Sequence, residues 1–377
     1  MHILFAGGGT AGHINPALAV AQYIKAKHPN ARISYIGKNG GMEERLVQNC
    51  GFDFYGIDVA GFQRSLSLKN ISRNISAAYK AVASSFDSKK LLKALNPDVV
   101  VGTGGYVSGP VLRQAAKMGI KTAIHEQNAF PGVTTKMLIN LVDTVMLAMP
   151  EAKARLNMEK KPVITGNPVR ADFGLLSNED GKKALSLPNK PVVLSYGGSL
   201  GARPINETVC QLIAKKWKDN DIIFIHAAGK ANYDKCIQSL KEAGVDINSE
   251  NVIIKDYIDN MGETMAAADL LISRAGAITL SELAVCGKPA ILIPSPYVAE
   301  NHQYHNAMSL KNVGAAEVIE EKDLSPEILI ETVERLIYNE SALNQMSEKA
   351  RLYAITDSCS RIYNEIMKLY TAPKNFS

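Results

Sequence analysis

Cysteine is scarce in this chain, and the cysteines present are not paired in the sequence. The 377 residues include five cysteines, and no C-x-x-C motif occurs. An odd number of scattered cysteines argues against a disulfide framework or a zinc module and is typical of a reducing cytoplasm. No run approaches the roughly 18 apolar residues of a membrane-spanning helix. The opening MHILFAGGG also lacks the features of a secretory signal. We therefore expect a cytoplasmic protein without disulfides.

A strong charge of either sign is absent as well. Lysine and arginine number 42 against 37 acidic residues, a net charge of +5, which is too small to indicate a nucleic-acid partner. Hydrophobic residues make up 46% of the chain and charged residues 21%, which excludes a disordered or fibrous protein. His302 and His305 have no carboxylates at metal-ligand spacing, so we expect no metal site.

Basic residues nevertheless gather in one segment. Residues 61–93 carry seven lysines and arginines against one acid, Asp87. Apolar residues alternate with them, which suits an anionic membrane surface, although a surface helix with a solvated basic face is the simpler explanation. The basic residues are Arg64, Lys69, Arg73, Lys80, Lys89, Lys90 and Lys93.

Short apolar runs alternate with helical segments along the chain. The runs at residues 3–6 and 192–196 each lead into a glycine-rich turn, at Gly7 and Gly197, and then into a helix. This alternation predicts an α/β protein with two Rossmann-like domains in tandem. A Gly-Asn-Pro cluster at residues 166–168 predicts the boundary. Further strands are predicted at 33–36, 99–101, 122–124, 145–147, 222–225, 252–254, 270–272 and 290–293.

The first glycine turn fits the dinucleotide fingerprint G-x-G-x-x-G at residues 7–12. That fingerprint also needs an acid at the end of the second strand. The strands at 33–36 and 222–225 run into GKN and HAAG instead, which argues against an NAD-dependent oxidoreductase. The turns either pack a strand tightly against a helix or bring the backbone close to a phosphate. A further glycine-rich turn at 102–105 favours the second interpretation.

His13 follows the first turn, just ahead of a predicted helix N-cap at Asn15 with Pro16 in the first helical position. A helix N-terminus disfavours the charged form of a histidine. A neutral imidazole there can accept a proton from an attacking hydroxyl group, or it can simply hydrogen-bond the loop. The residue pattern leaves both roles open.

The stretch SRAGAITLSE, residues 273–282, follows a predicted strand and opens a helix. Backbone N–H groups there can hold a diphosphate, and Glu282, expected on the first turn, can accept hydrogen bonds from ribose hydroxyls. Thr279 and Glu282 equally fit a capping box. Polar clusters at 301–306 and 125–128 also follow strands, where α/β folds bind ligands. A solvated helix start and ordinary loop polarity explain these clusters as well.

Seven segments together resemble the MurG family of peptidoglycan glycosyltransferases, in the family's order and across nearly the whole chain. They are GGGTAGHINPA (7–17), GTGGYVSGP (102–110), HEQNAFPG (125–132), GNPVR (166–170), GGSLGA (197–202), SRAGAITLSE (273–282) and NHQYHNA (301–307). The resemblance implies a GT-B fold, with two Rossmann-like domains and a cleft between them. The domains would be residues 1–166 and 167–356, with a C-terminal helix in 357–377 packed back on the first.

The resemblance also implies an activity. Members of the family move N-acetylglucosamine from UDP-N-acetylglucosamine to the muramyl sugar of lipid I, with inversion, and so form lipid II for peptidoglycan synthesis, cell shape and cell division. The enzyme would be peripheral on the cytoplasmic face of the bacterial plasma membrane, with no cofactor and no metal. The segment 61–93 would then suit both the anionic membrane and the polyprenyl acceptor.

The matching positions carry the family's roles over as expectations. His13 would be the general base, with Glu126 in reserve. Three matched positions, Ala11, Leu200 and His302, depart from residues common in the family. The expected substrate-binding residues are Thr10, Ala11, Gly12 and Asn128 in the first domain, and Arg170, Ser199, Ile258, Ala277, Ile278, Thr279, Leu280, Ser281, Glu282, Gln303 and Asn306 in the second.

Other functions stay open beside this one. A UDP-sugar 2-epimerase shares the expected architecture and needs no acceptor. A GT-B glycosyltransferase with a different acceptor would share the donor residues. A non-catalytic nucleotide-sugar-binding module is disfavoured, because polar clusters are expected in both domains and a binder needs only one.

Overall fold

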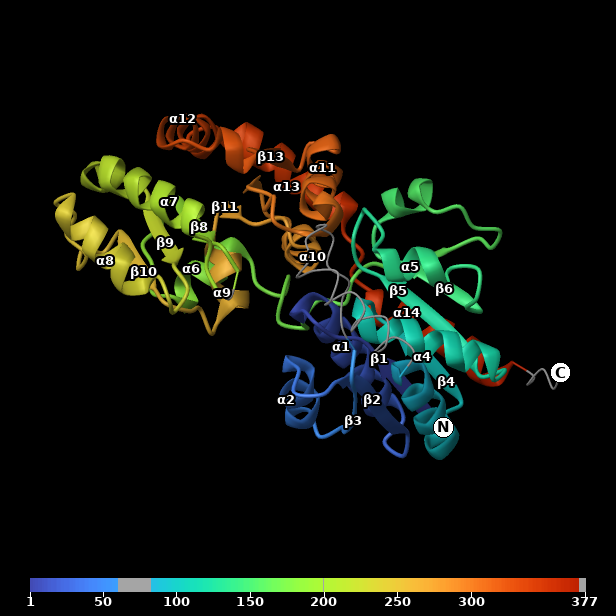
Figure 1. Cartoon of the computed structure of the whole chain (residues 1–377). Helices are drawn as coiled ribbons and strands as arrows, with labels where there is room; N and C mark the ends of the chain where they lie inside the picture. Colours follow the sequence, from blue (N-terminus) through green and yellow to red (C-terminus); the bar gives the residue numbers. More distant parts are fainter. Residues whose placement is uncertain (60–82, 199, 373–377) are drawn as a thin grey trace. The chain divides into compact units, whose positions relative to one another are not determined.

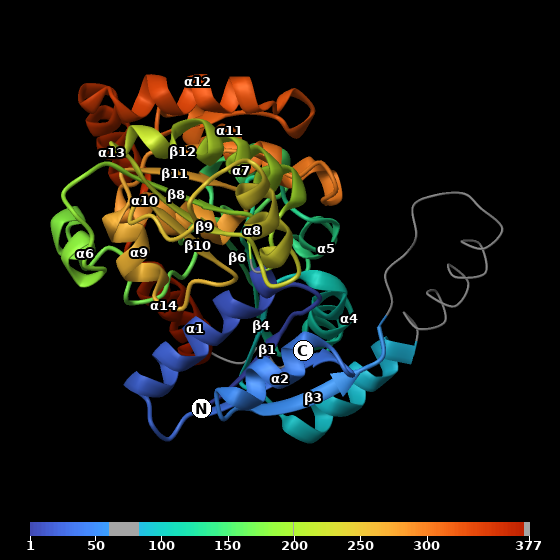
Figure 2. The same cartoon turned by 90° about the vertical axis from the view of Figure 1, so that its left-hand side faces the viewer.

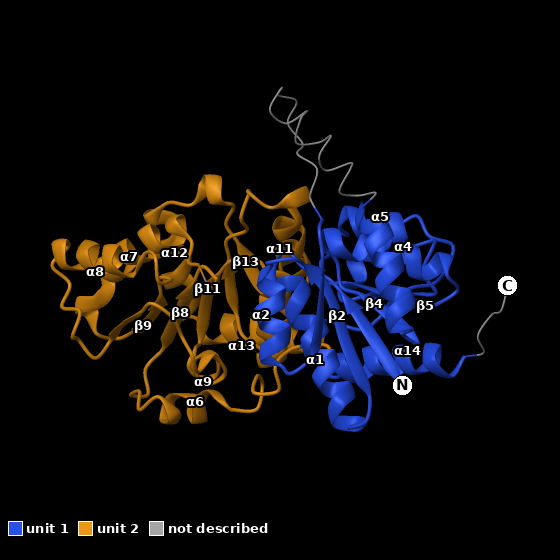
Figure 3. Ribbon diagram, turned by 60° about the horizontal axis from the view of Figure 1, so that its bottom comes forward, with its two compact units in different colours: residues 1–168, 357–377 blue, residues 169–356 orange. Residues whose placement is uncertain are grey.

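The computed structural model describes residues 1–59, 83–198 and 200–372. The chain divides into two compact units (Figure 3). Unit 1 comprises residues 1–168 and 357–377, and unit 2 comprises residues 169–356. Ser199 and the basic residues Arg64, Lys69, Arg73 and Lys80 lie outside the described residues. Lys89, Lys90 and Lys93 lie exposed on a helical stretch, residues 83–95.

In the described part of unit 1, seven parallel strands form one sheet in the order β3-β2-β1-β4-β5-β6-β7. Every residue of β1 and β4 is buried, as expected for a parallel sheet that is covered on both faces. The strands are β1 (His2–Ala6), β2 (Arg32–Lys38), β3 (Asp53–Ile57), β4 (Val99–Gly102), β5 (Lys121–Glu126), β6 (Thr144–Leu147) and β7 (Val163–Ile164).

Two apolar layers hold the helices of unit 1 on the sheet. One layer joins the sheet to α1 (Ala11–Lys27) and α14 (Ser358–Thr371), which pack side by side (Figure 2). The other joins it to α4 (Gly105–Lys117) and α5 (Val133–Leu138). The last helix of the chain therefore belongs to the first sheet, through Ile362 and Ile366. The remaining helices here are α2 (Met42–Asn49) and the 3-10 helix η1 (Pro150–Arg155).

The described part of unit 2 repeats the plan with six parallel strands in the order β10-β9-β8-β11-β12-β13 (Figure 1). One apolar layer joins the sheet to three helices, α7 (Arg203–Lys216), α8 (Tyr233–Glu242) and α12 (Pro326–Ile337). The strands are β8 (Val192–Tyr196), β9 (Ile223–Ala227), β10 (Val252–Lys255), β11 (Leu270–Ser273), β12 (Ala290–Leu292) and β13 (Ala316–Val318). The other helices are α6 (Asn178–Ala184), η2 (Trp217–Asp219), α9 (Met261–Ala267), α10 (Ala277–Cys286), η3 (Ala299–Asn301), α11 (His302–Asn312), η4 (Glu321–Asp323) and α13 (Glu340–Tyr353).

The predicted N-cap of the first helix is wrong. The helix begins at Ala11, with Thr10 as N-cap and Pro16 inside it. The Thr10 carbonyl accepts hydrogen bonds from the N–H groups of His13 and Ile14, at 3.0 and 3.3 Å. These bonds start the helix four residues before Asn15. His13 consequently lies in the first helical turn rather than in the loop.

Three strands escape the sequence prediction, namely β3, β7 and β13. Each lies at an edge of its sheet. Edge strands need no continuous apolar run, because one side faces no neighbouring strand. β7 has two residues and β13 has three, too few to show a period. Among the described residues, no helix is both long and apolar enough to cross a membrane.

The loops that follow β1 and β4 touch each other through their backbones. Gly105 has φ of +78°, and a Cβ atom there would lie 2.2 Å from the Gly8 carbonyl oxygen. Gly51 has a similar φ of +74°, but no atom lies within 4 Å of its Cβ position. The two glycines therefore share the left-handed backbone and differ in the space around them.

Replacing Gly105 by alanine should destabilise unit 1 by about 4 kcal/mol or more, because left-handed strain and a backbone clash combine. Gly51→Ala, the matched control, should cost about 1–2 kcal/mol from left-handed strain alone. Urea unfolding, with amide hydrogen exchange of β1 and β4, measures both. Equal losses of unfolding free energy in the two variants would show that the clash with the Gly8 carbonyl does not contribute to the loss.

Candidate active site

The predicted residues of unit 1 all lie at the carboxyl edge of its sheet, where parallel α/β sheets bind ligands. Thr10, Ala11 and Gly12 follow β1 at the start of α1, and Thr10 and Ala11 are exposed. Glu126 ends β5, and Asn128 follows it. The turn after β1 therefore presents a helix N-terminus, which favours an anionic group.

His13 lies on the first turn of α1, partly buried. Its Nδ1 atom is 3.0 Å from the Oε1 atom of Gln127. The ring rests against the backbone of Gly104, where a Cβ atom would lie 2.8 Å from Nδ1. The imidazole is thus held by Gln127 in the loop after β5 and by the glycine turn after β4, in addition to its own loop.

Glu126 is buried, and its carboxylate accepts four hydrogen bonds. Oε1 accepts from the backbone N and the side-chain Nδ2 of Asn128, both at 3.1 Å. Oε2 accepts from the Gly132 N at 3.0 Å and from the Thr135 hydroxyl at 2.5 Å. These bonds hold the loop between β5 and α5 and set the side chain of Asn128.

Glu43 is a second buried carboxylate in unit 1, and the sequence analysis missed it. It lies 1% exposed on α2, beneath the first glycine turn. Its carboxylate accepts from the Lys38 N at 2.8 Å and from the Gly9 N at 3.5 Å. These two bonds tie the end of β2 and the first glycine turn to α2. No sequence signal distinguishes it from its neighbour Glu44.

Two members of the polar cluster at 125–128 were given no individual role by the sequence analysis, His125 and Gln127. Both are 2% exposed. Gln127 Nε2 lies 3.1 Å from the His125 Nδ1, and His125 Nε2 lies 3.0 Å from the Gly166 carbonyl oxygen. Burial lowers the pKa of His125 below its usual value. Their place in the segment HEQN, beside Glu126 and Asn128, was the available signal.

Six of the donor residues predicted for unit 2, Ala277 to Glu282, lie on α10. Gly276 is the N-cap, and no side chain caps the helix, so the capping box of Thr279 and Glu282 is not formed. The N–H groups of the first turn, from Ala277 onward, lie at the carboxyl edge of the sheet after β11. Glu282 lies on the second turn, not the first as expected, because the helix begins at Ala277.

Glu282 is partly buried, and burial raises the pKa of its carboxyl group to about 7. The positive charge of Arg170 opposes that shift, and the negative charge of Asp172 adds to it. Arg170 is exposed and donates two hydrogen bonds to Asp172, at 3.0 and 2.6 Å. These three charged side chains of unit 2 act on one another beside α10.

The polar cluster after β12 braces the same region. Asn306 on α11 is buried, and its Nδ2 donates to the Ala275 carbonyl oxygen at 3.2 Å. Gln303 accepts from the Ser295 N at 2.9 Å through Oε1. The Asn306 bond ties α11 to the loop that precedes α10. Ile258, buried between β10 and α9, lies in the loop after β10.

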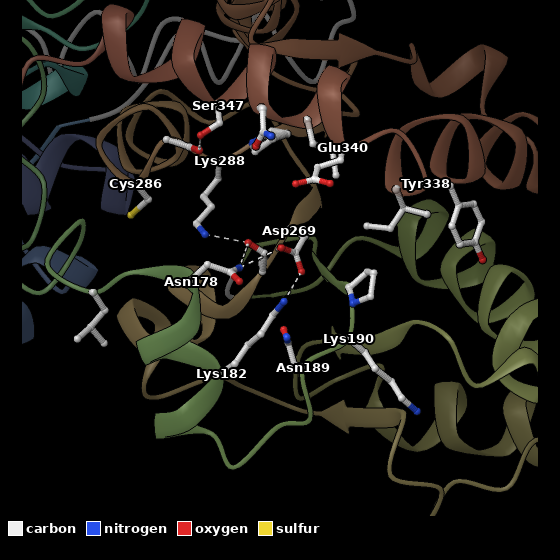
Figure 4. Close-up of a pocket in the computed structure, with 18 of the residues that line it drawn as sticks. Asn178, Lys182, Asn189, Lys190, Asp269, Cys286, Lys288, Tyr338, Glu340 and Ser347 are labelled. Atoms are coloured by element: carbon white, nitrogen blue, oxygen red, sulfur yellow. Dashed lines mark hydrogen bonds and ion pairs between the residues drawn. The ribbon is translucent and has the colours of Figure 1, made fainter.

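A separate cavity of about 580 Å³ opens at the amino ends of β8, β11 and β12 (Figure 4). Its two buried lysines are already paired. Lys182 pairs with Asp269 at 2.9 Å, and Lys288 Nζ donates to the Ala266 and Ala268 carbonyls at 2.6 and 2.8 Å. Burial lowers the pKa of Lys288 to about 8. This pocket lies at the amino edge of the sheet, whereas α10 begins at the carboxyl edge. Its ion pair and lysine hydrogen bonds join the chain segments around the pocket.

The family models match most of the chain. Residues 3–147 match the glycosyltransferase family 28 N-terminal domain, and residues 192–362 match the glycosyltransferase family 28 C-terminal domain.

Curated relatives are similar over nearly the whole length. One is the UDP-N-acetylglucosamine--N-acetylmuramyl-(pentapeptide) pyrophosphoryl-undecaprenol N-acetylglucosamine transferase of Acetivibrio thermocellus. It is 45% identical over 98% of this chain and 98% of the relative. The protein of the same name from Bacillus cytotoxicus is 43% identical over 98% of this chain and 99% of its own length.

Solved structures are also similar to this chain over nearly its whole length. The crystal structure of Acinetobacter baumannii MurG matches with a TM-score of 0.80 at 29% identity, over 97% of this chain and 99% of that one. The UDP-GlcNAc 2-epimerase of Neisseria meningitidis matches with a TM-score of 0.64 at 15% identity, over 98% of this chain and 100% of that one. At 15% identity the second match shows a shared fold alone.

Replacing Glu282 by glutamine should change stability in a pH-dependent way. The raised pKa means that folded unit 2 binds this proton more tightly than the unfolded chain does, so its stability falls as pH rises from about 4.5 to about 7. Glu282→Gln removes that loss. The variant should be more stable than wild type by about 1–3 kcal/mol at pH ~8 and similar at pH ~4.5.

Trp217 is the one tryptophan of the chain and lies in unit 2, so urea unfolding followed by its fluorescence reports on the right unit. Glu331→Gln, on the exposed face of α12, is the matched control. A difference between Glu282→Gln and wild type that stays constant from pH ~4.5 to pH ~8 would contradict the raised pKa.

Proposed function

We propose that this chain, which belongs to the MurG group of glycosyltransferase family 28, is an inverting N-acetylglucosaminyltransferase. It transfers N-acetylglucosamine from UDP-N-acetylglucosamine to the muramyl sugar of lipid I and forms lipid II for peptidoglycan synthesis. The observation that carries the proposal is the pairing of a helix N-terminus with a functional side chain in each unit. His13 stands on α1 in unit 1, and Glu282 stands on α10 in unit 2.

Unit 2 binds the donor in this proposal. The diphosphate lies at the start of α10, where backbone N–H groups and the helix dipole favour negative charge. The same groups stabilise the charge that develops on the departing UDP. Glu282 accepts from the ribose hydroxyls, and the backbone at Ile258 binds uracil. Gln303 and Asn306 orient the sugar. Arg170 and Ser199 act near the diphosphate, Arg170 after releasing Asp172.

Unit 1 binds the acceptor. The turn after β1, with Thr10, Ala11 and Gly12, receives the acceptor's diphosphate, and Asn128 contacts its sugar. His13 is the general base that takes the proton of the attacking hydroxyl. Glu126 is a positioning residue, since four donors already occupy its carboxylate. No cofactor is needed, because the N–H groups at the start of α10 stabilise the leaving UDP and His13 takes the proton.

A membrane surface is the third partner that we propose, with the protein peripheral on the cytoplasmic face. Val133 and Met137 are 52% and 66% exposed, one turn apart on α5, and Leu141 beyond them is 50% exposed. Lys136 and Arg155 flank the Phe130 ring, at 4.2 and 4.9 Å from its centre. Exposed apolar side chains with basic neighbours suit an anionic lipid surface. We call Val133, Met137 and Leu141 the α5 patch.

The enzymatic proposal is tested with radiolabelled UDP-N-acetylglucosamine, with and without a lipid I analogue. Label should move to the lipid, and UDP release should depend on the acceptor. His13→Ala should lower kcat about 10²- to 10⁴-fold, as is usual for loss of a general base. Conversion of the sugar nucleotide without acceptor would replace the proposal by a 2-epimerase. Turnover with another acceptor only would place the chain among glycosyltransferases of different specificity.

Replacing the α5 patch by serines should weaken binding to vesicles that contain anionic lipid by at least about 10-fold, since each apolar side chain loses its transfer into the interface. Flotation of the protein with such vesicles measures the binding. Leu352→Ser, 73% exposed on α13 of unit 2, is the control. Transfer to an acceptor without the polyprenyl chain should stay unchanged. Equal vesicle binding by patch variant and wild type would exclude this surface.

A further inference from the structure

Four residues of unit 1 form a continuous chain of hydrogen bonds that begins at His13. His13 Nδ1 lies 3.0 Å from Gln127 Oε1, and Gln127 Nε2 lies 3.1 Å from His125 Nδ1. His125 Nε2 lies 3.0 Å from the carbonyl oxygen of Gly166. The chain thus runs from the partly buried imidazole of His13 into the buried interior behind β5. Each ring nitrogen in this chain can act only as a donor or only as an acceptor. Which of the two it is follows from the Gly166 carbonyl oxygen at the buried end of the chain.

The Gly166 end sets the tautomer of His125. A carbonyl oxygen only accepts hydrogen bonds, so His125 Nε2 must carry a hydrogen. Burial lowers the pKa of His125, so this ring is neutral and its Nδ1 keeps a lone pair. Nδ1 of His125 is therefore an acceptor and needs a donor opposite it.

The side-chain amide of Gln127 has only one orientation that satisfies its neighbours. Its Nε2 lies 3.1 Å from the His125 Nδ1 and 3.0 Å from the His125 carbonyl oxygen, and both are acceptors. Turning the amide over would place its oxygen against both of them. Asn167 Nδ2 also donates to the Gln127 carbonyl oxygen at 3.1 Å and so fixes the backbone there. The amide oxygen must therefore point toward His13.

We propose that Gln127 is a positioning residue that holds His13 as the Nδ1–H tautomer and leaves the Nε2 lone pair to accept the substrate proton. Since Gln127 Oε1 only accepts, Nδ1 of His13 donates to it. The proposal rests on the proposed function for what Nε2 does. The tautomer itself rests on the hydrogen bonds alone.

The transfer step then balances as follows. The acceptor hydroxyl oxygen forms a bond to the anomeric carbon while its proton moves to His13 Nε2. The bond between that carbon and the diphosphate oxygen breaks, and its electron pair leaves with UDP. His13 becomes an imidazolium with both nitrogens protonated, still donating to Gln127 through Nδ1, and later loses the Nε2 proton to water.

An amide partner suits this base better than a carboxylate would. A carboxylate opposite Nδ1 fixes the tautomer and also raises the pKa of the histidine. The neutral oxygen of Gln127 fixes the tautomer without placing a second charge beside the ring. In the serine-protease triad, loss of the correct tautomer lowers kcat about 10⁴-fold with geometry intact, which shows how large the effect can be.

The tautomer is measured by nitrogen-15 NMR of the imidazole rings in the full chain without substrate, at pH ~8. His13 should show the Nδ1–H pattern and His125 the Nε2–H pattern. His2 serves as an internal reference for Nδ1–H, since its Nδ1 lies 3.0 Å from the Leu95 carbonyl oxygen. In Gln127→Met, His13 should become a mixture of both tautomers. An Nε2–H pattern for His13 in the wild-type protein overturns the proposal, and this measurement needs no variant to fold.

Kinetics supply the second readout. Gln127→Met should lower kcat by about 10- to 10²-fold, less than His13→Ala, and leave the KM for the donor within about two-fold, because the donor lies on unit 2. The double variant should be no slower than His13→Ala alone, since Gln127 acts only through His13. Gln238→Met, on the exposed face of α8, is the control.

The two proposals fail in different ways. Losses that simply multiply in the double variant, or an unchanged tautomer in Gln127→Met, overturn the role of Gln127. Absence of acceptor-dependent transfer by the wild-type protein overturns the proposed function, whereas the NMR pattern is recorded without any substrate and is unaffected by that result.

Discussion

Backbone-to-backbone contact between neighbouring glycine loops is a packing constraint that each unit shows separately. In unit 1, Gly105 approaches the Gly8 carbonyl so closely that a Cβ atom would lie 2.2 Å from its oxygen, and in unit 2 a Cβ atom on Gly201 would lie 2.1 Å from the Ala228 carbonyl oxygen. Only residues without a side chain allow these approaches. The contacts lie beside the starts of α4 and α7, and Gly104, next to Gly105, packs against the ring of His13.

Buried carboxylates serve two different purposes around these loops. Glu126 and Glu43 receive hydrogen bonds from backbone N–H groups and so hold loops in place, with their charge compensated. The described residues offer Glu282 no such set of donors, and burial raises its pKa to about 7. A carboxylate left under-compensated in the free protein is well suited to a ligand that brings hydroxyl donors. Glu126 and Glu43 thus have a structural role, whereas Glu282 is suited to bind a ligand.

The strand and helix pattern of the chain was largely readable, because parallel strands covered on both faces are continuous apolar runs, as in β8 and β4. The edge strand β3 was not readable because its residues are mixed, and β7 and β13 were not readable because two and three residues are too few to show a period. The start of α1 was misplaced because Asn15 and Pro16 have strong local preferences, and the backbone bonds of Thr10 prevailed. The positions of His13 and of the α10 loop in sequence did identify their places at the sheet edge.

The sequence by itself determined the α/β class, the two repeated strand–turn–helix openings and the family, because these depend on local runs and on motifs of eleven residues or fewer. It also indicated His13 and Glu282. Only the tertiary structure decided the chemical state of these groups. Gln127 lies 114 residues from His13 along the chain, and the amide's orientation is set by His125 and Gly166. A proton's position depends on which donors and acceptors meet, and long-range packing alone brings them together.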